Sequence, residues 1–310
     1  MGKLANIAPY KGGGITPELQ KYLDILYDSL RGDITLSSGN VILNGITIAS
    51  GCIPSNGTDA TNDLDFSVGI QRNSSNTYTI RANSAFTKRA DATWAAGTGN
   101  GGLAATLTWA ANDWHLHLLG KSADPTAFDY IFDTSATCVN GLADDAVEAA
   151  GFDIYKRVGS LRTGGAAWPS FHAREVAIGK VRYLLKAVVF ELTKDWAGAD
   201  DTAQTGTLAA VPGGIQVDAI LGVVFTDSSA AAVSALLVSS LDQTDTAANS
   251  ALSTYVGTIR LTSTAGANSS ASCVIPVSTS TSRTFRYRGA DTTVDHNASF
   301  CTHGWEDTRL

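Results

Sequence analysis

The sequence predicts a mainly β protein, in which a short N-terminal helix precedes two antiparallel β-sandwich (jelly-roll-like) domains. Three observations lead to this prediction. A helical pattern is confined to residues 16–32, short runs of alternating apolar and polar residues recur from residue 64 onward, and turn-forming residues separate those runs. The expected domains are residues 1–49 (an anchor holding the helix and a hairpin), 50–180 and 181–310.

The expected helix begins at Thr16, a good N-cap residue, and Pro17 suits its first turn. Gly32 can adopt the left-handed conformation that ends a helix. An isolated helix of this length is marginal in water, so its apolar side must be buried. That side could pack on the protein's own β domain, on copies of itself, or in a larger assembly, and periodicity leaves these alternatives open. We call this side the leucine seam: Leu19, Leu23, Leu26 and Leu30.

The segment "VILNGITI" (41–48) predicts a hairpin, because Asn44-Gly45 is the dipeptide that a type I′ turn favours. The polar segment 50–63 is interpreted as a linker. Alternating runs then predict strands at 64–71, 77–88, 103–110, 113–121 and 127–135.

The segment "VRYLLKAVVFEL" (181–192) fits a helical and a strand pattern, and its β-branched content favours a buried strand. Residues 229–241 carry the same ambiguity. The remaining expected strands are 214–227, 255–264, 271–279 and 283–289.

The formal charge of −7, with only 22 Lys and Arg, argues against nucleic-acid binding. No run of 18 apolar residues predicts membrane insertion, and the N-terminus has no apolar signal-peptide region. The product is therefore expected to be soluble and made in a cytoplasm. The four cysteines lie far apart, which predicts buried thiols instead of a zinc site or a disulfide scaffold.

The segment "GTGNGG" (97–102) matches a dinucleotide-binding pattern, but no apolar strand precedes it and no helix follows, so we interpret it as a loop. His115 and His117 share one face of a strand. Ordinary sheet-surface histidines are the preferred interpretation over metal ligands on a trimer axis. No pattern of catalytic residues is recognisable, so no enzyme, metal or cofactor is predicted. Trp94, Trp109 and Trp114 are expected in the core, and no residue is assigned to glycan contact.

Three stretches resemble structural proteins encoded by tailed bacteriophages and prophages. They are "YKRVGSLRTGGAAWPSF" (155–171), which follows "AFDYIFDTS" (127–135), the ending "CTHGWEDTRL" (301–310), and "TWAAGTGNGGL" (93–103). The resemblance covers roughly residues 60–310. It departs from the usual double arginine of the first stretch by having Lys156-Arg157.

The resemblance implies a virion component without transferring catalytic residues. Together with the leucine seam, it predicts a homotrimeric tail fibre, head fibre or spike that is made in a bacterial host cytoplasm and attaches to other virion proteins through residues 1–33. The exposed part is expected to contact a host surface, with host glycans as the candidate partner. The alternatives are a head-decoration or neck protein that stabilises the particle, a glycan-binding module without a virion role, and a polysaccharide-degrading spike whose paired carboxylates the sequence does not reveal.

Overall fold

The computed structural model describes residues 34–37, 40–43, 49–196, 202–227, 235–245, 258–260, 269–290 and 296–309. The chain divides into two compact units, residues 1–48 and 49–310, each described here by itself. In the first unit, β1 (Ile34–Ser37) pairs antiparallel with β2 (Asn40–Leu43). The hairpin expected at 41–48 overlaps β2 in residues 41–43, and in the structure these residues pair with β1. Its turn at 44–45, the expected helix and the leucine seam lie outside the described residues.

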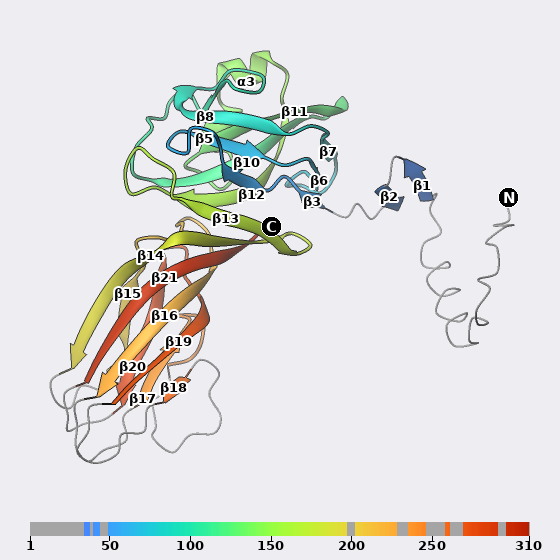
Figure 1. Ribbon diagram of the computed structural model, residues 1–310. Coiled ribbons are helices and arrows are strands. Elements are labelled where there is room, and N and C mark those ends of the chain that lie inside the picture. Colours follow the sequence, from blue (N-terminus) through green and yellow to red (C-terminus); the bar gives the residue numbers. More distant parts are fainter. Residues whose placement is uncertain are drawn as a thin grey trace, which may run out of the picture. The chain divides into compact units, whose positions relative to one another are not determined.

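The second unit is built from several β-sheets (Figure 1). Residues 50–162 form a seven-stranded and a three-stranded sheet. Neighbouring strands are antiparallel, except that β9 runs parallel to both of its neighbours. The larger sheet has the order β12 (Ile154–Arg162), β10 (Asp113–Lys121), β11 (Asp124–Asp133), β9 (Gly101–Leu103), β8 (Phe86–Thr93), β5 (Asp63–Phe66), β4 (Pro54–Asn56). The smaller has the order β3 (Ser50–Gly51), β6 (Gly69–Arg72), β7 (Thr79–Ala82).

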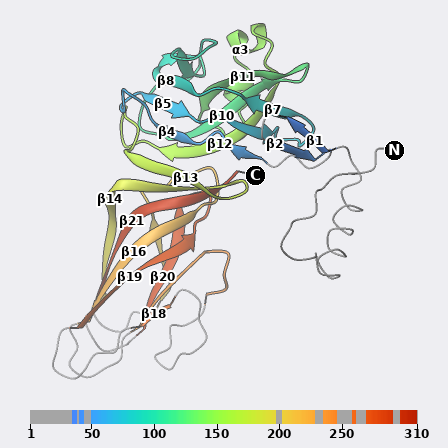
Figure 2. The ribbon, with the colours of Figure 1, turned by 45° about the vertical axis from the view of Figure 1, so that its right-hand side comes forward.

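Residues 171–308 supply two further antiparallel sheets. The rings of Phe285 and Tyr287 from one sheet lie 5.2 and 5.1 Å from the ring of Phe300 in the other, so their inner faces share a core. The five-stranded sheet, whose strands run side by side in Figure 2, has the order β13 (Phe171–Ala177), β14 (Lys180–Trp196), β21 (His296–Thr308), β16 (Asp218–Asp227), β19 (Ser269–Ser278). The four-stranded sheet has the order β15 (Gln204–Thr207), β20 (Thr284–Ala290), β17 (Ala235–Ser239), β18 (Thr258–Arg260).

Two short helices, α2 (Val139–Leu142) and α3 (Asp145–Ala149), lie between β11 and β12, where the sequence predicts no element. Asp144 caps α3 by accepting a hydrogen bond from the Ala146 N–H. The carboxylate of Asp133, at the end of β11, accepts hydrogen bonds from Asn140 and from the Gly141 N–H, which holds α2 against the strand. None of the described helices is long and apolar enough to span a membrane.

The mainly β prediction is confirmed. The strands expected at 113–121, 127–135 and 181–192 correspond to β10, β11 and β14. The interpretation of 181–192 as a strand is therefore correct, but the expectation that it is buried holds only near Val181 and Tyr183, because Val188 and Phe190 are exposed. The runs at 214–227, 271–279 and 283–289 contain β16, β19 and β20, and the described parts of 229–241 and 255–264 contain β17 and β18.

The interpretation of residues 50–63 as a linker is wrong, because this segment holds β3, β4 and the fully buried Cys52. The strand expected at 103–110 is also wrong, since only Leu103 belongs to β9. Trp109 packs on Trp114 and Trp168 from a loop, and Leu107 is likewise half-buried against the core without belonging to a strand. The runs 64–71 and 77–88 each divide into two strands.

One hydrophobic core runs through both groups of sheets in residues 49–310. Trp168 and Phe171, in the connection between the two groups, are nearly fully buried, as are Tyr183 on β14 and Trp305 on β21. The division of this unit into two domains near residue 180 stays a prediction. The chain passes from the first two sheets to the other two earlier than that, between the end of β12 at Arg162 and the start of β13 at Phe171.

Candidate functional site

We call the segment "RVGSLRT" (157–163) the β12 motif. Most of it belongs to β12, the edge strand of the seven-stranded sheet, and each of its polar side chains forms a hydrogen bond or an ion pair. Val158 and Leu161 are fully buried, so the motif crosses the core. A charged side chain is tolerated in such a strand only when it is paired and hydrogen-bonded. The partners of these side chains therefore identify what the motif holds together.

Arg157 forms a buried ion pair with Asp307 on β21. Its Nη1 lies 2.8 and 2.6 Å from the two carboxylate oxygens and 3.0 Å from the Ser160 hydroxyl, while Nη2 donates to the Thr308 carbonyl at 2.7 Å. The side chain of Asp307 is fully buried and that of Arg157 is 7% exposed. The guanidinium thus ties the β12 motif to the C-terminal strand across 150 residues of sequence.

Gly159 lets the two groups of sheets approach closely. A Cβ atom at this position would lie 2.1 Å from the hydroxyl oxygen of Tyr183, so only glycine leaves room for that ring. Tyr183 in turn stacks on Trp305, with ring centroids 5.1 Å apart and planes 13° from parallel. The glycine of the motif therefore places the aromatic pair of the neighbouring sheet directly beside the ion pair.

Ser160 links Arg157 to the buried His115 on β10. Its hydroxyl accepts from the arginine, which leaves its proton free for the Nδ1 of His115 at 2.8 Å. Burial, with a smaller contribution from the nearby Arg157 charge, lowers the pKa of His115 to about 4. Burial also lowers the pKa of His117 to about 3, and its Nε2 contacts the Ser135 carbonyl at 2.9 Å. Both imidazoles are therefore neutral in the folded protein at neutral pH.

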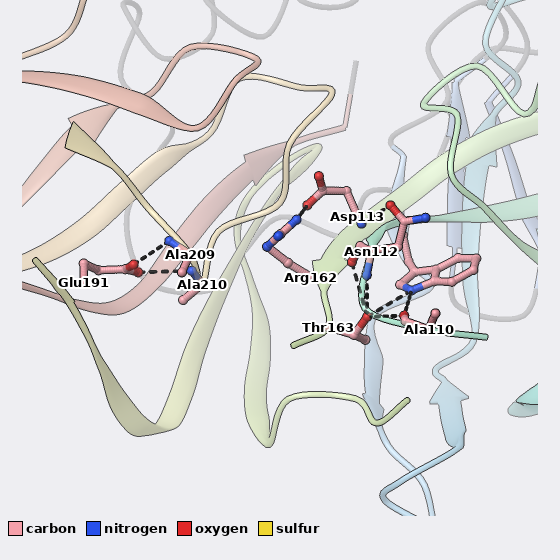
Figure 3. A network of polar contacts seen from close by, with 9 residues as sticks. Ala110, Asn112, Asp113, Arg162, Thr163, Glu191, Ala209 and Ala210 are labelled. Atoms are coloured by element: carbon pink, nitrogen blue, oxygen red, sulfur yellow. Dashed lines mark hydrogen bonds and ion pairs between the residues drawn. The ribbon is translucent and has the colours of Figure 1, made fainter. Parts of the chain in front are cut away.

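Arg162 and Thr163 complete the motif (Figure 3). Arg162 Nη1 lies 2.8 Å from a carboxylate oxygen of Asp113. The Thr163 hydroxyl donates to the Ala110 carbonyl and accepts from the Asn112 N–H and the Trp114 indole N–H. These contacts fix the loop that leads into β10. Elsewhere in Figure 3, the Glu191 carboxylate accepts the N–H groups of Ala209 and Ala210 and so holds the loop after β15.

The C-terminal segment 305–309 contributes the other half of this site. The Glu306 carboxylate binds Lys180 at 2.6 Å and also Arg182; although burial opposes the effect, these partners lower its pKa. Arg309 donates to the Gly51 carbonyl at 2.6 Å and to the Cys52 carbonyl. The last described residues of the chain are thus bonded to the first strand of the second unit. We call the β12 motif and residues 305–309 together the junction.

A cleft of about 520 Å³ lies beside the junction. Its lining comes from both groups of sheets and contains many polar side chains, although apolar atoms make up most of the exposed lining surface, and none of the lining residues is aromatic. It therefore offers hydrogen-bonding groups to a small polar molecule but no ring on which a sugar could stack. The residues that line it are Ala136, Thr137, Arg157, Ile215, Gln216, Val217, Asp218, Ser278, Thr281, Glu306 and Thr308.

The interpretation of His115 and His117 as sheet-surface residues is wrong, because both side chains are fully buried between strands. Within the described ranges, His, Cys, Asp and Glu form no group of three that could hold a metal ion. All four cysteines are free thiols; Cys52 and Cys138 are buried as expected, and the other two are half-buried. The prediction that Trp94 and Trp114 belong to the core is confirmed, and Trp109 packs against that core.

The comparisons with known proteins add no functional information. No family model and no curated protein matches the sequence. A search of solved structures returns "Structure of infectious bursal disease virus Gx strain", 11% identical, with 84% of this chain and 75% of that chain covered and a TM-score of 0.19. A TM-score this low does not indicate a common fold.

The junction predicts strong energetic coupling between Arg157 and Asp307. We expect Arg157→Met to lower the free energy of unfolding by about 3–5 kcal/mol, because it leaves a buried carboxylate unpaired. The double variant with Asp307→Leu should be clearly more stable than the sum of the single losses predicts, as measured by urea unfolding of all four proteins.

Arg89→Met is the matched control, since Arg89 pairs with Asp91 at 3.0 Å but its side chain is 49% exposed. That variant should cost less than about 1 kcal/mol. Additive losses at Arg157 and Asp307, or equal losses at Arg157 and Arg89, would contradict the role given to the junction.

The buried His115 predicts a dependence of stability on pH. Its pKa is about 4 in the folded protein and near the ordinary 6.5 when unfolded, so between these values the unfolded chain binds more protons. The free energy of unfolding should therefore fall as pH drops below 6.5. The loss of stability caused by His115 should reach about 2 kcal/mol at pH 5. His115→Asn should flatten this slope in urea titrations, whereas the exposed His172→Asn should not. Identical slopes for wild type and His115→Asn would refute the assignment.

Proposed function

We propose that this protein is a structural component of a tailed-phage virion, most simply a homotrimeric fibre or spike. In this proposal, residues 1–33 attach to other virion proteins and a helix over 16–32 sets the oligomer through the leucine seam. The β-sheets of residues 49–310 form two antiparallel sandwich domains that face the host surface. The proposal assigns no catalytic residue.

One observation carries the proposal. Two of the stretches that resemble phage structural proteins, 155–171 and 301–310, meet in the Arg157–Asp307 ion pair. The shared pattern therefore consists of residues that hold a β-rich body together: an ion pair, a close-approach glycine and a stacked tryptophan. Such a pattern is expected in a family of structural proteins whose members share a fold, and it does not require that they share an enzymatic activity.

The outer face of the five-stranded sheet also supports contact with other polypeptides. Phe190, Cys301, Gly222 and Val274 lie in one row across four strands, and Val224 lies one row away. The side chains of Phe190 and Val274 are 64% and 58% exposed. Adjacent exposed apolar side chains are typical of interfaces, and in this proposal a second copy of the chain covers them.

The leucine seam provides the direct test. Replacing Leu23 and Leu26 with Asp should convert the oligomer into monomers, because two carboxylates cannot be buried between packed helices. Multi-angle light scattering of the full chain gives the mass. Lys21→Asp is the control: it changes the charge by the same amount and lies opposite the seam in the expected helix. A wild-type monomer, or an unchanged oligomer in the Leu variant, would refute the proposal.

A further inference from the structure

Lys88 and Asp129 form a second buried ion pair, far in sequence from the junction residues. Lys88 Nζ lies 2.8 Å from Asp129 Oδ1, and the two side chains are 0% and 2% exposed. Lys88 belongs to β8 and Asp129 to β11, and β9 lies between these strands in the sheet. The lysine side chain must therefore reach past an intervening strand to meet the carboxylate.

The glycines of the segment 97–102 make this reach possible. A Cβ atom on Gly102 would lie 3.1 Å from the Cβ of Lys88 and 2.8 Å from the ring of Phe132, so the lysine occupies space that a side chain on β9 would fill. The segment is a loop that leads into a short strand, as expected from the sequence. Its glycines thus serve the Lys88–Asp129 pair instead of a dinucleotide.

Three acceptors surround Lys88 Nζ, as a charged ammonium requires, so the amine becomes neutral by passing one proton to Asp129 Oδ1. Nζ lies 2.6 Å from the Ala95 carbonyl and 3.2 Å from the Gly101 carbonyl. A neutral amine has two N–H bonds and one lone pair. When the two carbonyls accept the two N–H groups, the lone pair is left to face the carboxyl group of Asp129. The rings of Phe86 and Trp94, with centroids 5.6 and 5.2 Å from Nζ, help to exclude water.

The carboxyl group of Asp129 is held by two backbone donors. The Gly97 N–H lies 2.8 Å from Oδ2, and the Tyr130 N–H lies 2.6 Å from Oδ1. Burial lowers the pKa of Lys88 and raises the pKa of Asp129, although each charge partly opposes the effect on the other. Both shifts favour the uncharged amine and the uncharged acid, which are the forms that can react with each other.

We propose that Lys88 and Asp129 are a self-reacting pair that condenses into an isopeptide bond between Nζ and Cγ, with release of one water molecule. The amine attacks Cγ, and the negative charge that develops on Oδ2 is stabilised by the Gly97 N–H. One amine proton passes to Oδ1, the C–Oδ1 bond breaks, and water leaves. The second amine proton stays on the amide nitrogen, so the step balances without an oxidant or cofactor. The fixed contact between the two groups supplies the proximity that the reaction needs.

The bond would join β8 to β11 covalently across β9. Like a disulfide, it would stabilise the fold mainly by restricting the unfolded chain, and unlike a disulfide it would resist reduction. This inference does not depend on a virion role, because it concerns only residues within the second unit.

Mass spectrometry of the full chain under denaturing conditions tests the inference. The expected intact mass is lower than the sequence mass by one water molecule. A tryptic digest should contain a branched peptide that joins residues 82–89 to residues 122–156, because cleavage after a modified Lys88 is blocked. An intact mass equal to that of the sequence, or a water loss located on any other peptide, would overturn the inference.

Three variants sharpen this test. Lys88→Met should show no mass loss, while the neighbouring Arg89→Met, whose side chain is half-exposed, should lose water as the wild type does. Asp129→Asn keeps the shape of the site but offers ammonia as the leaving group, so its mass should fall by one ammonia molecule. The wild-type mass and its branched peptide are the deciding measurement, because they do not depend on whether Lys88→Met folds.

Discussion

The buried ion pair between Arg157 and Asp307 is the constraint on which the rest of the second unit depends. A guanidinium and a carboxylate removed from water are stable together only when nearly all their hydrogen-bonding groups are satisfied. Here the arginine reaches both carboxylate oxygens, a hydroxyl and a backbone carbonyl. That requirement fixes the position of β12, the edge strand of one sheet, relative to β21 in the other. The close approach of Gly159 to Tyr183 and the stacking of Tyr183 on Trp305 then follow from the same alignment.

The junction also explains how the second unit is closed. Two residues beyond Asp307, Arg309 donates to the carbonyls of Gly51 and Cys52, so the last described residues hold the first strand. Because the first strand of this unit is bonded to its last described residues, a pull on the preceding segment would not readily detach that strand from the fold. In the proposed function, the second unit is attached to other virion proteins through residues 1–33, which belong to the separate unit 1–48.

Much of the fold could be predicted from the sequence where apolar residues are dense along a strand. The runs that became β10, β11 and β14 carry enough apolar residues to be recognised. Burial of Cys52 was expected, but the strands β3 and β4 on either side of it could not be recognised, because that segment is polar and Arg309, at the other end of the chain, bonds to its backbone. Likewise, two histidines that alternate along a strand look the same whether they face solvent or core. Their burial depends on neighbours such as Ser160 that are distant in sequence.

The candidate site was visible only in part. The resemblance to phage proteins identified both halves of the junction, but not that they touch, because pairing across 150 residues leaves no local pattern. One signal was available: Arg157 stands beside Val158 in a β-like run, and a charge in such a run needs a partner, whereas Asp307 stands between the polar Glu306 and Thr308. The Lys88–Asp129 pair carried this signal at Asp129, which stands between Phe128 and Tyr130.

Calorimetry of the full chain tests most directly whether the junction makes residues 49–310 one cooperative body. If the ion pair and the continuous core couple all four sheets, these residues should unfold in a single transition whose calorimetric and van't Hoff enthalpies agree. Two separate transitions, one for the sheets built from residues 50–162 and one for those built from residues 171–308, would contradict the account.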